Sequence, residues 1–157
     1  MTLLQRRALG PLLGSLALLL GALAFQYLGG LAPCHLCLLQ RWPHAIAIAL
    51  GVILLARPSR WLALLAGLVV LAGAGIAVYH VGVEQSWWAG PSSCTAPAPG
   101  TQSSGDLLDQ ILATPVVLCD QVAWSLWGIS MAGWNAILSL VLAWLWLRAA
   151  AAGEQER

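Results

Sequence analysis

Four long apolar stretches, each nearly free of charged side chains, constrain the fold of this chain more than any other feature. They cover approximately residues 9–28, 38–56, 61–82 and 125–147. A helix of about 20 residues spans the roughly 30 Å hydrocarbon core of a bilayer. Only 8% of the 157 residues are charged, against about 25% in soluble domains. The sequence therefore predicts an all-α integral membrane protein, with residues 1–157 forming one membrane domain built as a four-transmembrane-helix bundle.

The first apolar stretch has a second interpretation, a cleaved signal peptide. Arg6 and Arg7 precede it, and residues 22–24 (Ala-Leu-Ala) resemble a processing site. The stretch is longer than the apolar core of a usual signal peptide, however, and a proline directly before the first cysteine fits neither this kind of site nor a lipoprotein site. We expect an uncleaved span.

The connections between the stretches are of two kinds. Residues 57–60 (Arg-Pro-Ser-Arg) form a polar turn, because proline lacks the N–H that would continue a helix. Residues 83–124 form a long loop, of which 90–105 is rich in Gly, Pro and Ser and should be irregular. Residues 106–113 then place apolar side chains on one helical face behind Asp106, which predicts a short amphipathic helix lying flat on the membrane surface.

Three glycines of the third stretch, Gly67, Gly73 and Gly75, are candidates for helix contacts. Small residues occupy the contact faces of helices in lipid because they let two backbones come close. We expect all three to permit close approach of a neighbouring helix.

The arginines predict the orientation. The chain has no lysine, and six of its seven basic residues lie in the N-terminal segment, the second connection and the C-terminal segment: Arg6, Arg7, Arg57, Arg60, Arg148 and Arg157. Four spans place these segments on one side, and the positive-inside rule makes that side the cytoplasm. Segments 29–37 and 83–124 would then face the periplasm of a bacterial inner membrane. The net charge of +1 gives no indication of a nucleic-acid partner.

All four cysteines, Cys34, Cys37, Cys94 and Cys119, fall in the two segments expected to face outward. The periplasm is oxidising, so disulfides form and persist there. Three pairings are possible, and the natural one joins Cys34 to Cys37 and Cys94 to Cys119. A purely structural role is an open alternative for Cys94–Cys119. It is less attractive for Cys34–Cys37, because closing so short a loop removes little chain entropy.

Cys34 and Cys37 form a Cys-x-x-Cys pair, a pattern that carries out redox chemistry or binds metal. A zinc site would have to recruit further ligands, such as His35 or the two cysteines of the long loop, and an oxidising compartment disfavours it. Covalent haem attachment requires a histidine directly after the second cysteine, where Leu38 stands. We expect a redox-active dithiol without metal.

Arg41 lies inside the second apolar stretch, where an arginine is costly and by default functional. If the helix has begun by Leu38, then Cys37, Arg41 and His44 share one face. The guanidinium is then expected to favour the thiolate of Cys37, the reactive form of the thiol. It is also expected to donate hydrogen bonds to a carbonyl oxygen of an electron acceptor. The alternative is an arginine that snorkels to the outer headgroups.

Other candidate residues surround this centre. His80, near the outer end of the third stretch, is expected to hydrogen-bond or protonate the same acceptor, with a headgroup contact as the alternative. Trp124 belongs either to the interfacial aromatic belt or to the acceptor pocket. His35, inside the dithiol motif, is placed to tune its redox potential. His44 is interpreted as a helix-packing histidine.

These motifs resemble the disulfide bond formation protein B (DsbB) family of bacterial quinone-dependent thiol oxidases. The resemblance rests on Cys34-His-Leu-Cys37 followed by Leu-Leu-Gln-Arg41, on residues 79–81 (Tyr-His-Val) and on residues 119–135. It extends over nearly the whole chain, with four spans and two cysteine pairs in the expected places. The segment around Cys94 shows little of the family pattern.

The resemblance implies an electron route. A reduced periplasmic oxidoreductase of the DsbA type attacks Cys94–Cys119 and forms a mixed disulfide with Cys94. Cys119 attacks Cys34 and frees Cys37, which passes electrons to ubiquinone or menaquinone of the respiratory pool. Arg41 would lie beside the ring, with His80 and Trp124 as further quinone-binding candidates. The four cysteines are thus the catalytic candidates.

Two competing functions follow from the same residues. One is a membrane protein whose disulfides only brace its outer loops. The other is a protein similar to vitamin K epoxide reductase, which also couples a helical bundle to quinone through Cys-x-x-Cys. In that family the active dithiol is expected late in the chain, whereas here it precedes the second span.

Overall fold

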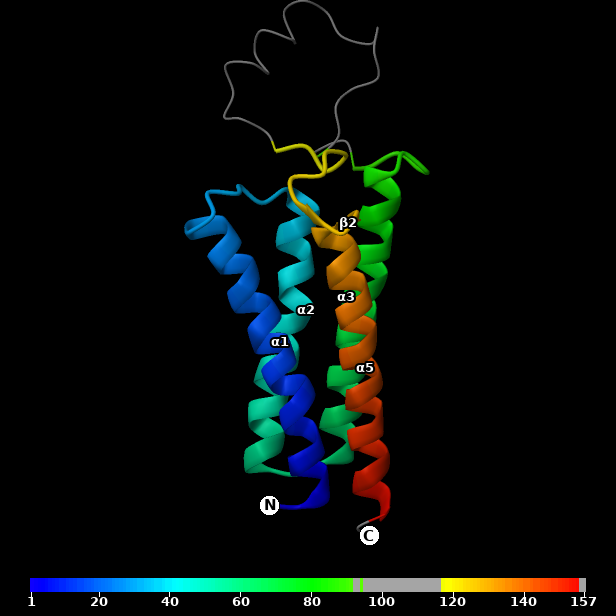
Figure 1. Ribbon diagram of the computed structural model, residues 1–157. Helices are drawn as coiled ribbons and strands as arrows, with labels where there is room; N and C mark the ends of the chain where they lie inside the picture. The colour runs from blue at the N-terminus through cyan, green and yellow to red at the C-terminus, as the bar shows by residue number, and fades with distance from the viewer. Residues whose placement is uncertain (92–93, 95–116, 156–157) are drawn as a thin grey trace, which may run out of the picture.

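The computed structural model describes residues 1–91, 94 and 117–155, and its main elements are four helices arranged as an antiparallel bundle (Figure 1). The helices are α1 (Leu3–Tyr27), α2 (His35–Ala56), α3 (Arg60–Glu84) and α5 (Met131–Gln155). Each is long and apolar enough to cross a membrane. The predicted four-helix membrane bundle is therefore confirmed.

The helix ends differ from the expected spans for local reasons. Thr2 caps α1 through a capping box with Gln5, so the helix begins at Leu3 and includes both N-terminal arginines. The helix α2 begins at His35, because Cys34 is its N-cap residue. The amphipathic helix expected at residues 106–113 lies outside the described part of the chain.

The fourth helix begins at Met131 and not near Ser125 as expected. The residues before it form a small hairpin, in which β1 (Ser125–Leu126) pairs antiparallel with β2 (Ile129–Ser130). Both residues of the connecting turn have positive φ, 53° at Trp127 and 77° at Gly128. Two such residues form the tight turns that match the twist of paired strands, and apolar composition alone does not reveal them.

The four helices pack as a square, with contacts between α3 and α5, α2 and α3, α1 and α5, and α1 and α2. Both termini and the connection between α2 and α3 lie at one end, and the cysteine-bearing segments lie at the other (Figure 1). The half of the bundle near the termini is the packed half, and the half near the cysteines contains the candidate site.

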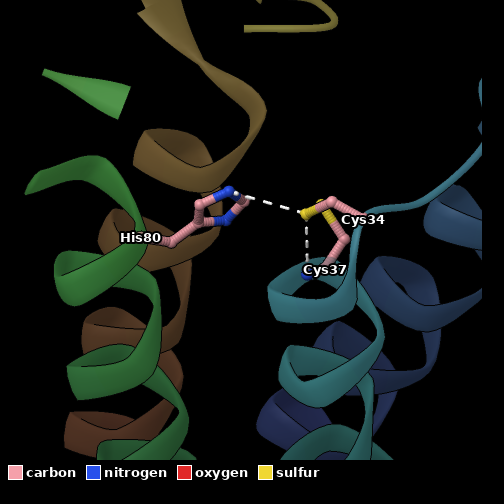
Figure 2. Close-up of side chains that lie close together, drawn as sticks. All are labelled: Cys34, Cys37 and His80. Carbon is pink, nitrogen blue, oxygen red and sulfur yellow. Dashed lines mark hydrogen bonds between the residues drawn. The ribbon is translucent and has the colours of Figure 1, made fainter. Parts of the chain in front are cut away.

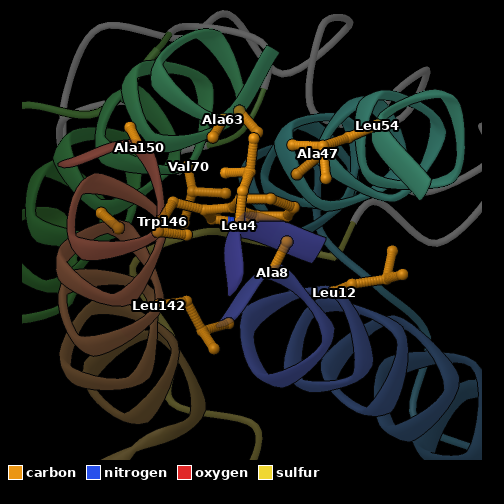
Figure 3. Close-up of a cluster of buried hydrophobic side chains, with 13 residues drawn as sticks. Leu4, Ala8, Leu12, Ala47, Leu54, Ala63, Val70, Leu142, Trp146 and Ala150 are labelled. Atoms are coloured by element: carbon orange, nitrogen blue, oxygen red, sulfur yellow. The ribbon is translucent and has the colours of Figure 1, made fainter. Parts of the chain in front are cut away.

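The packed half, near the termini, holds the main core (Figure 3). Trp146 of α5 is fully buried there among side chains from all four helices. Two glycines make room for it: a Cβ on Gly51 would lie 3.1 Å from the Trp146 ring, and one on Gly67 would lie 3.2 Å from Trp146 Cβ. Small residues thus let the helices close around one large side chain.

The glycines of α3 differ in their surroundings. Gly67 and Gly73 do permit close approach of a neighbouring helix, since a Cβ on Gly73 would lie 2.8 Å from Pro43 Cβ of α2. The same expectation for Gly75 is wrong: it is exposed, and a Cβ there would have no neighbour within 4 Å. The helix turns Gly75 away from the contact that Gly73 makes.

This difference gives a matched pair of stability predictions. Gly73→Ala is expected to destabilise the bundle by about 1–3 kcal/mol, because the rigid Pro43 ring cannot yield to the new methyl group. Gly75→Ala, placed in open space, is expected to be neutral or slightly stabilising. Unfolding of both variants in mixed micelles with increasing sodium dodecyl sulfate measures the difference. Equal midpoints would contradict the contact between α2 and α3 at Gly73.

Candidate functional site

Cys34 sits at the N-terminus of α2, at the end of the bundle opposite the termini. Its backbone is extended, and its Sγ accepts a hydrogen bond from the Cys37 backbone N–H at 3.2 Å. The same Sγ lies 2.9 Å from Cys37 Sγ. Cys34 and Cys37 are both free thiols, the first buried and the second partly exposed. The helix start therefore holds the two sulfurs within hydrogen-bond distance, as a Cys-x-x-Cys redox pair requires.

His80 of α3 contacts this pair from across the bundle (Figure 2). Its Nε2 lies 3.6 Å from Cys34 Sγ and 4.0 Å from a carboxylate oxygen of Glu84, one turn further along α3. Ser130 donates a hydrogen bond to the other oxygen of that carboxylate. The sulfur of Cys34 is thus surrounded by the thiol and backbone N–H of Cys37 and by an imidazole.

These contacts favour the anionic form of Cys34. The hydrogen bond from the Cys37 thiol, then those from His80 and the Cys37 backbone, lower the pKa of Cys34 to about 4 despite its burial. The sequence-based expectation located the reactive thiolate on Cys37, beside Arg41. In the structure the contacts that stabilise a thiolate converge on Cys34.

This lowered pKa predicts when Cys34 takes up a proton. The thiolate should predominate above about pH 4, so an infrared S–H stretching band of Cys34 should appear only as the pH falls through about 4. The band is identified by comparison with Cys34→Ser in the reduced protein. In His80→Phe the band should appear at higher pH, because one hydrogen-bond donor to the sulfur is lost. A strong Cys34 band in the wild-type protein at pH 7 would contradict this arrangement.

The second cysteine pair lies against the first. Cys94 and Cys119 form a disulfide and are almost fully buried. The Sγ atoms of Cys34, Cys94 and Cys119 all lie within 4.8 Å of one another. Cys34 is therefore the member of the Cys-x-x-Cys pair that is close enough for exchange with the loop disulfide.

Cys37 instead lines a cavity of about 340 Å³ between α1, α2 and α5. Its walls are mainly apolar, and it is also lined by Arg41, His80 and Trp124. The Trp124 ring contacts Phe25 of α1, with the ring centroids 5.1 Å apart. All three residues expected to bind an acceptor thus line one cavity together with Cys37.

Arg41 is held at the cavity wall by Gln26 of α1. Its Nη1 donates a hydrogen bond to Gln26 Oε1 at 2.6 Å, while its Nε is buried without a hydrogen-bond partner among the described residues. An unpaired buried donor is costly, and Arg41 lines the cavity, so its guanidinium is a group suited to a carbonyl oxygen there. The side chain does not snorkel freely, because Gln26 holds one end of the guanidinium.

Several polar residues of this half were not singled out by the sequence reasoning. Gln40 contacts His80, and Asn135 of α5 contacts both Gln40 and His44. His44, interpreted above as a packing histidine, also lines the cavity. The available signal was the occurrence of uncharged polar side chains within otherwise apolar stretches, where each requires a partner. Glu84, at the end of α3, carried no such signal.

The thiols also satisfy a geometric condition for a metal site. Cys34, Cys37 and His80 each offer one ligand atom, all within 4.8 Å of one another. A structural zinc site requires a fourth ligand, and the two remaining cysteines are engaged in their own disulfide. The neighbouring disulfide and the apolar cavity favour thiol exchange over metal binding.

Comparison with known proteins gives one consistent result. The family model described as disulfide bond formation protein DsbB matches residues 5–149. A disulfide bond formation protein B of Methylococcus capsulatus is 35% identical over 140 residues, covering 80% of this chain and 81% of that protein. One from Pasteurella multocida is 35% identical over 147 residues, covering 87% and 81%. One from Verminephrobacter eiseniae is 34% identical over 145 residues, covering 83% and 78%. No solved structure gives a significant match.

Proposed function

Because this chain belongs to the disulfide bond formation protein B (DsbB) family, we propose that it is a quinone-dependent membrane thiol oxidase that reoxidises a periplasmic oxidoreductase of the DsbA type. Membership makes it a membrane protein of disulfide bond formation. The proposal of a quinone-dependent thiol oxidase rests on one observation, the different surroundings of the two cysteines of the Cys-x-x-Cys pair. Cys34 lies against Cys94–Cys119, whereas Cys37 lines the cavity with Arg41.

The first steps are thiol–disulfide exchanges between sulfurs. A thiolate of the soluble partner attacks Cys94, and a new intermolecular S–S bond replaces Cys94–Cys119. Cys119 leaves as a thiolate and attacks Cys34 of the oxidised Cys34–Cys37 pair. The S–S bond of that pair breaks, and Cys37 carries away the bonding electrons. Support comes from the proximity of the three sulfurs concerned, all within 4.8 Å.

The pair then returns to its oxidised form. The second thiolate of the partner attacks the mixed disulfide, which releases the oxidised partner and the Cys94 thiolate. Cys94 attacks Cys119 of the Cys34–Cys119 bond, so Cys94–Cys119 reforms and Cys34 leaves as a thiolate. Cys34, favoured as a thiolate 2.9 Å from Cys37 Sγ, would then attack Cys37 Sγ and close the Cys34–Cys37 bond, and the electron pair displaced from Cys37 would pass to the acceptor in the cavity. Two electrons leave the pair in this step together with the proton of Cys37, since the proton of Cys34 has been released beforehand. A bound quinone would supply the chemistry required, because its reduction to quinol takes up two electrons and two protons.

The side chains that line the cavity are suited to binding a quinone. It is mainly apolar, as a ring with an isoprenoid tail requires, and the buried Nε of Arg41 has no partner in the part of the chain that the structure describes. Arg41 would hold a ring oxygen, Trp124 would pack against the ring, and His80 lies at the same wall. A partner of the DsbA type has a reduction potential of about −120 mV, so its reoxidation requires a strong acceptor. Ubiquinone and menaquinone of the respiratory pool are the candidates.

One assay tests the proposed function. Purified protein is mixed with a reduced DsbA-type oxidoreductase and ubiquinone-1, and quinone absorbance is followed together with the thiol content of the partner. Loss of one quinone per partner disulfide formed is the expected result. Partner oxidation without quinone loss, or no reaction at all, would refute the proposal.

We also propose that the cysteine end of the bundle faces the periplasm of a bacterial inner membrane. Five of the arginines lie in segments at the end that holds the start of α1, the connection between α2 and α3, and the end of α5 (Figure 1): Arg6, Arg7, Arg57, Arg60 and Arg148. Green fluorescent protein fused to the C-terminus should therefore fluoresce, and alkaline phosphatase fused there should be inactive. The reverse pattern would invert the orientation.

A further inference from the structure

A continuous line of buried polar side chains leads from the catalytic cysteine pair into the bundle. Cys34 Sγ lies 3.6 Å from His80 Nε2, as Figure 2 shows, and His80 Nδ1 lies 2.8 Å from Gln40 Nε2. Gln40 Oε1 accepts a hydrogen bond from Asn135 Nδ2 at 2.6 Å. Asn135 Oδ1 lies 3.1 Å from His44 Nε2. Three helices thus contribute to one chain of contacts.

The direction of each hydrogen bond follows from the amide groups. Asn135 donates to Gln40 Oε1, so the other end of the Gln40 amide, its NH₂ group, faces His80 Nδ1. An amide nitrogen only donates, and Nδ1 must then be the unprotonated nitrogen of the ring. In a neutral imidazole the proton is consequently on Nε2, the nitrogen that faces Cys34 Sγ.

The surroundings of Nε2 agree with this proton position. Two acceptors lie near it, the sulfur of Cys34 at 3.6 Å and a carboxylate oxygen of Glu84 at 4.0 Å. At the far end, His44 Nε2 and the Ser139 hydroxyl both lie at hydrogen-bond distance from Asn135 Oδ1. Reversing this line of hydrogen bonds would require the side-chain amides of Gln40 and Asn135 both to rotate by half a turn.

We infer that Gln40, oriented by Asn135, is a positioning residue that holds His80 in its Nε2–H tautomer as a hydrogen-bond donor to Cys34. The inference deepens the proposed function, because it rests on Cys34 as a redox-active sulfur. A neutral donor stabilises the Cys34 thiolate without taking its proton. A proton on His80 Nδ1 would place an N–H against the Gln40 NH₂ group, so the amide disfavours a proton at Nδ1.

Nuclear magnetic resonance of the ¹⁵N-histidine-labelled protein tests the tautomer directly. The chain has only three histidines, and His35→Gln and His44→Gln identify the His80 signals. The reduced wild-type protein should show the His80 proton on Nε2. In Gln40→Glu, a change of similar size, His80 Nδ1 should become protonated, because a carboxylate accepts and an amide NH₂ group does not. A wild-type proton on Nδ1, or a His80 spectrum unchanged by Gln40→Glu, would overturn the inference.

The consequence for Cys34 is measured by its S–H infrared band. In Gln40→Leu the tautomer is no longer held, and the pH at which the band appears should rise by about one unit, a tenfold change in proton affinity. Ser139→Ala is the matched control, since it removes one donor from Asn135 and leaves the Asn135–Gln40 contact in place. An unchanged midpoint in Gln40→Leu would refute the role of Gln40. These readouts do not involve quinone, so they fail or succeed separately from the quinone assay.

Discussion

Cys37→Ser is expected to abolish electron transfer to quinone while the four-helix bundle still folds. Cys37 is the only cysteine among the described residues that line the cavity, so no other described thiol is adjacent to the site proposed for the acceptor. Turnover should fall on the order of a thousandfold or more, as it does when a covalent catalytic group is removed. The measurement is the rate of ubiquinone-1 loss with reduced partner in excess.

The trapped species makes this prediction specific. Without Cys37 the Cys34–Cys37 disulfide cannot form, so Cys119 has no disulfide to attack. The partner should therefore accumulate in a mixed disulfide with Cys94, which is visible on a non-reducing gel. The matched control is Cys37→Ser in the oxidised, partner-free protein, whose Cys94–Cys119 bridge should form normally. Wild-type quinone reduction by Cys37→Ser would instead contradict the proposal that Cys37 passes the electrons to the acceptor.

Arg41→Met is expected to produce the second large loss, at the binding of the acceptor. Arg41 contributes the unpaired buried donor of the cavity, and removing one such donor from a site of developing negative charge typically costs a factor of about 10²–10³. Arg41→Lys should recover only part of the activity. An ammonium group lacks the planar fork that lets Arg41 contact Gln26 and still offer a second donor.

Separate measurement of kcat and KM for ubiquinone-1 shows whether the loss of activity arises in the binding or in the reduction of the acceptor. We expect Arg41→Met to raise KM and lower kcat, because the donor would hold the bound ring and would also stabilise the negative charge that develops on its oxygen during reduction. Arg57→Met, at the other end of α2, is the matched control and should leave both parameters unchanged. Equal effects of the two substitutions would show that Arg41 acts only through the general stability of the bundle.

The sequence alone determined the class of the fold and the identity of the redox groups. Four apolar stretches with few charges allow little other than four spanning helices, and a Cys-x-x-Cys pair keeps its two sulfurs close in any helix start. The positions of Arg41 and His80 near the ends of their stretches also indicated a common depth. The family resemblance, which extends over most of the chain, agrees with the matched family model.

Only the tertiary structure decided which side chains meet across the bundle. In lipid every face of a spanning helix is apolar, so hydropathy does not specify how each helix is rotated. That rotation brings His80 of α3 to Cys34 of α2, and turns Gly73, but not Gly75, towards Pro43. It also places Cys34 against the loop disulfide and Cys37 at the cavity, which agrees with the roles that the family resemblance implied and that the spacing of two cysteines alone cannot reveal. Periodicity is a local property of the chain, whereas these contacts depend on the packing of separate helices.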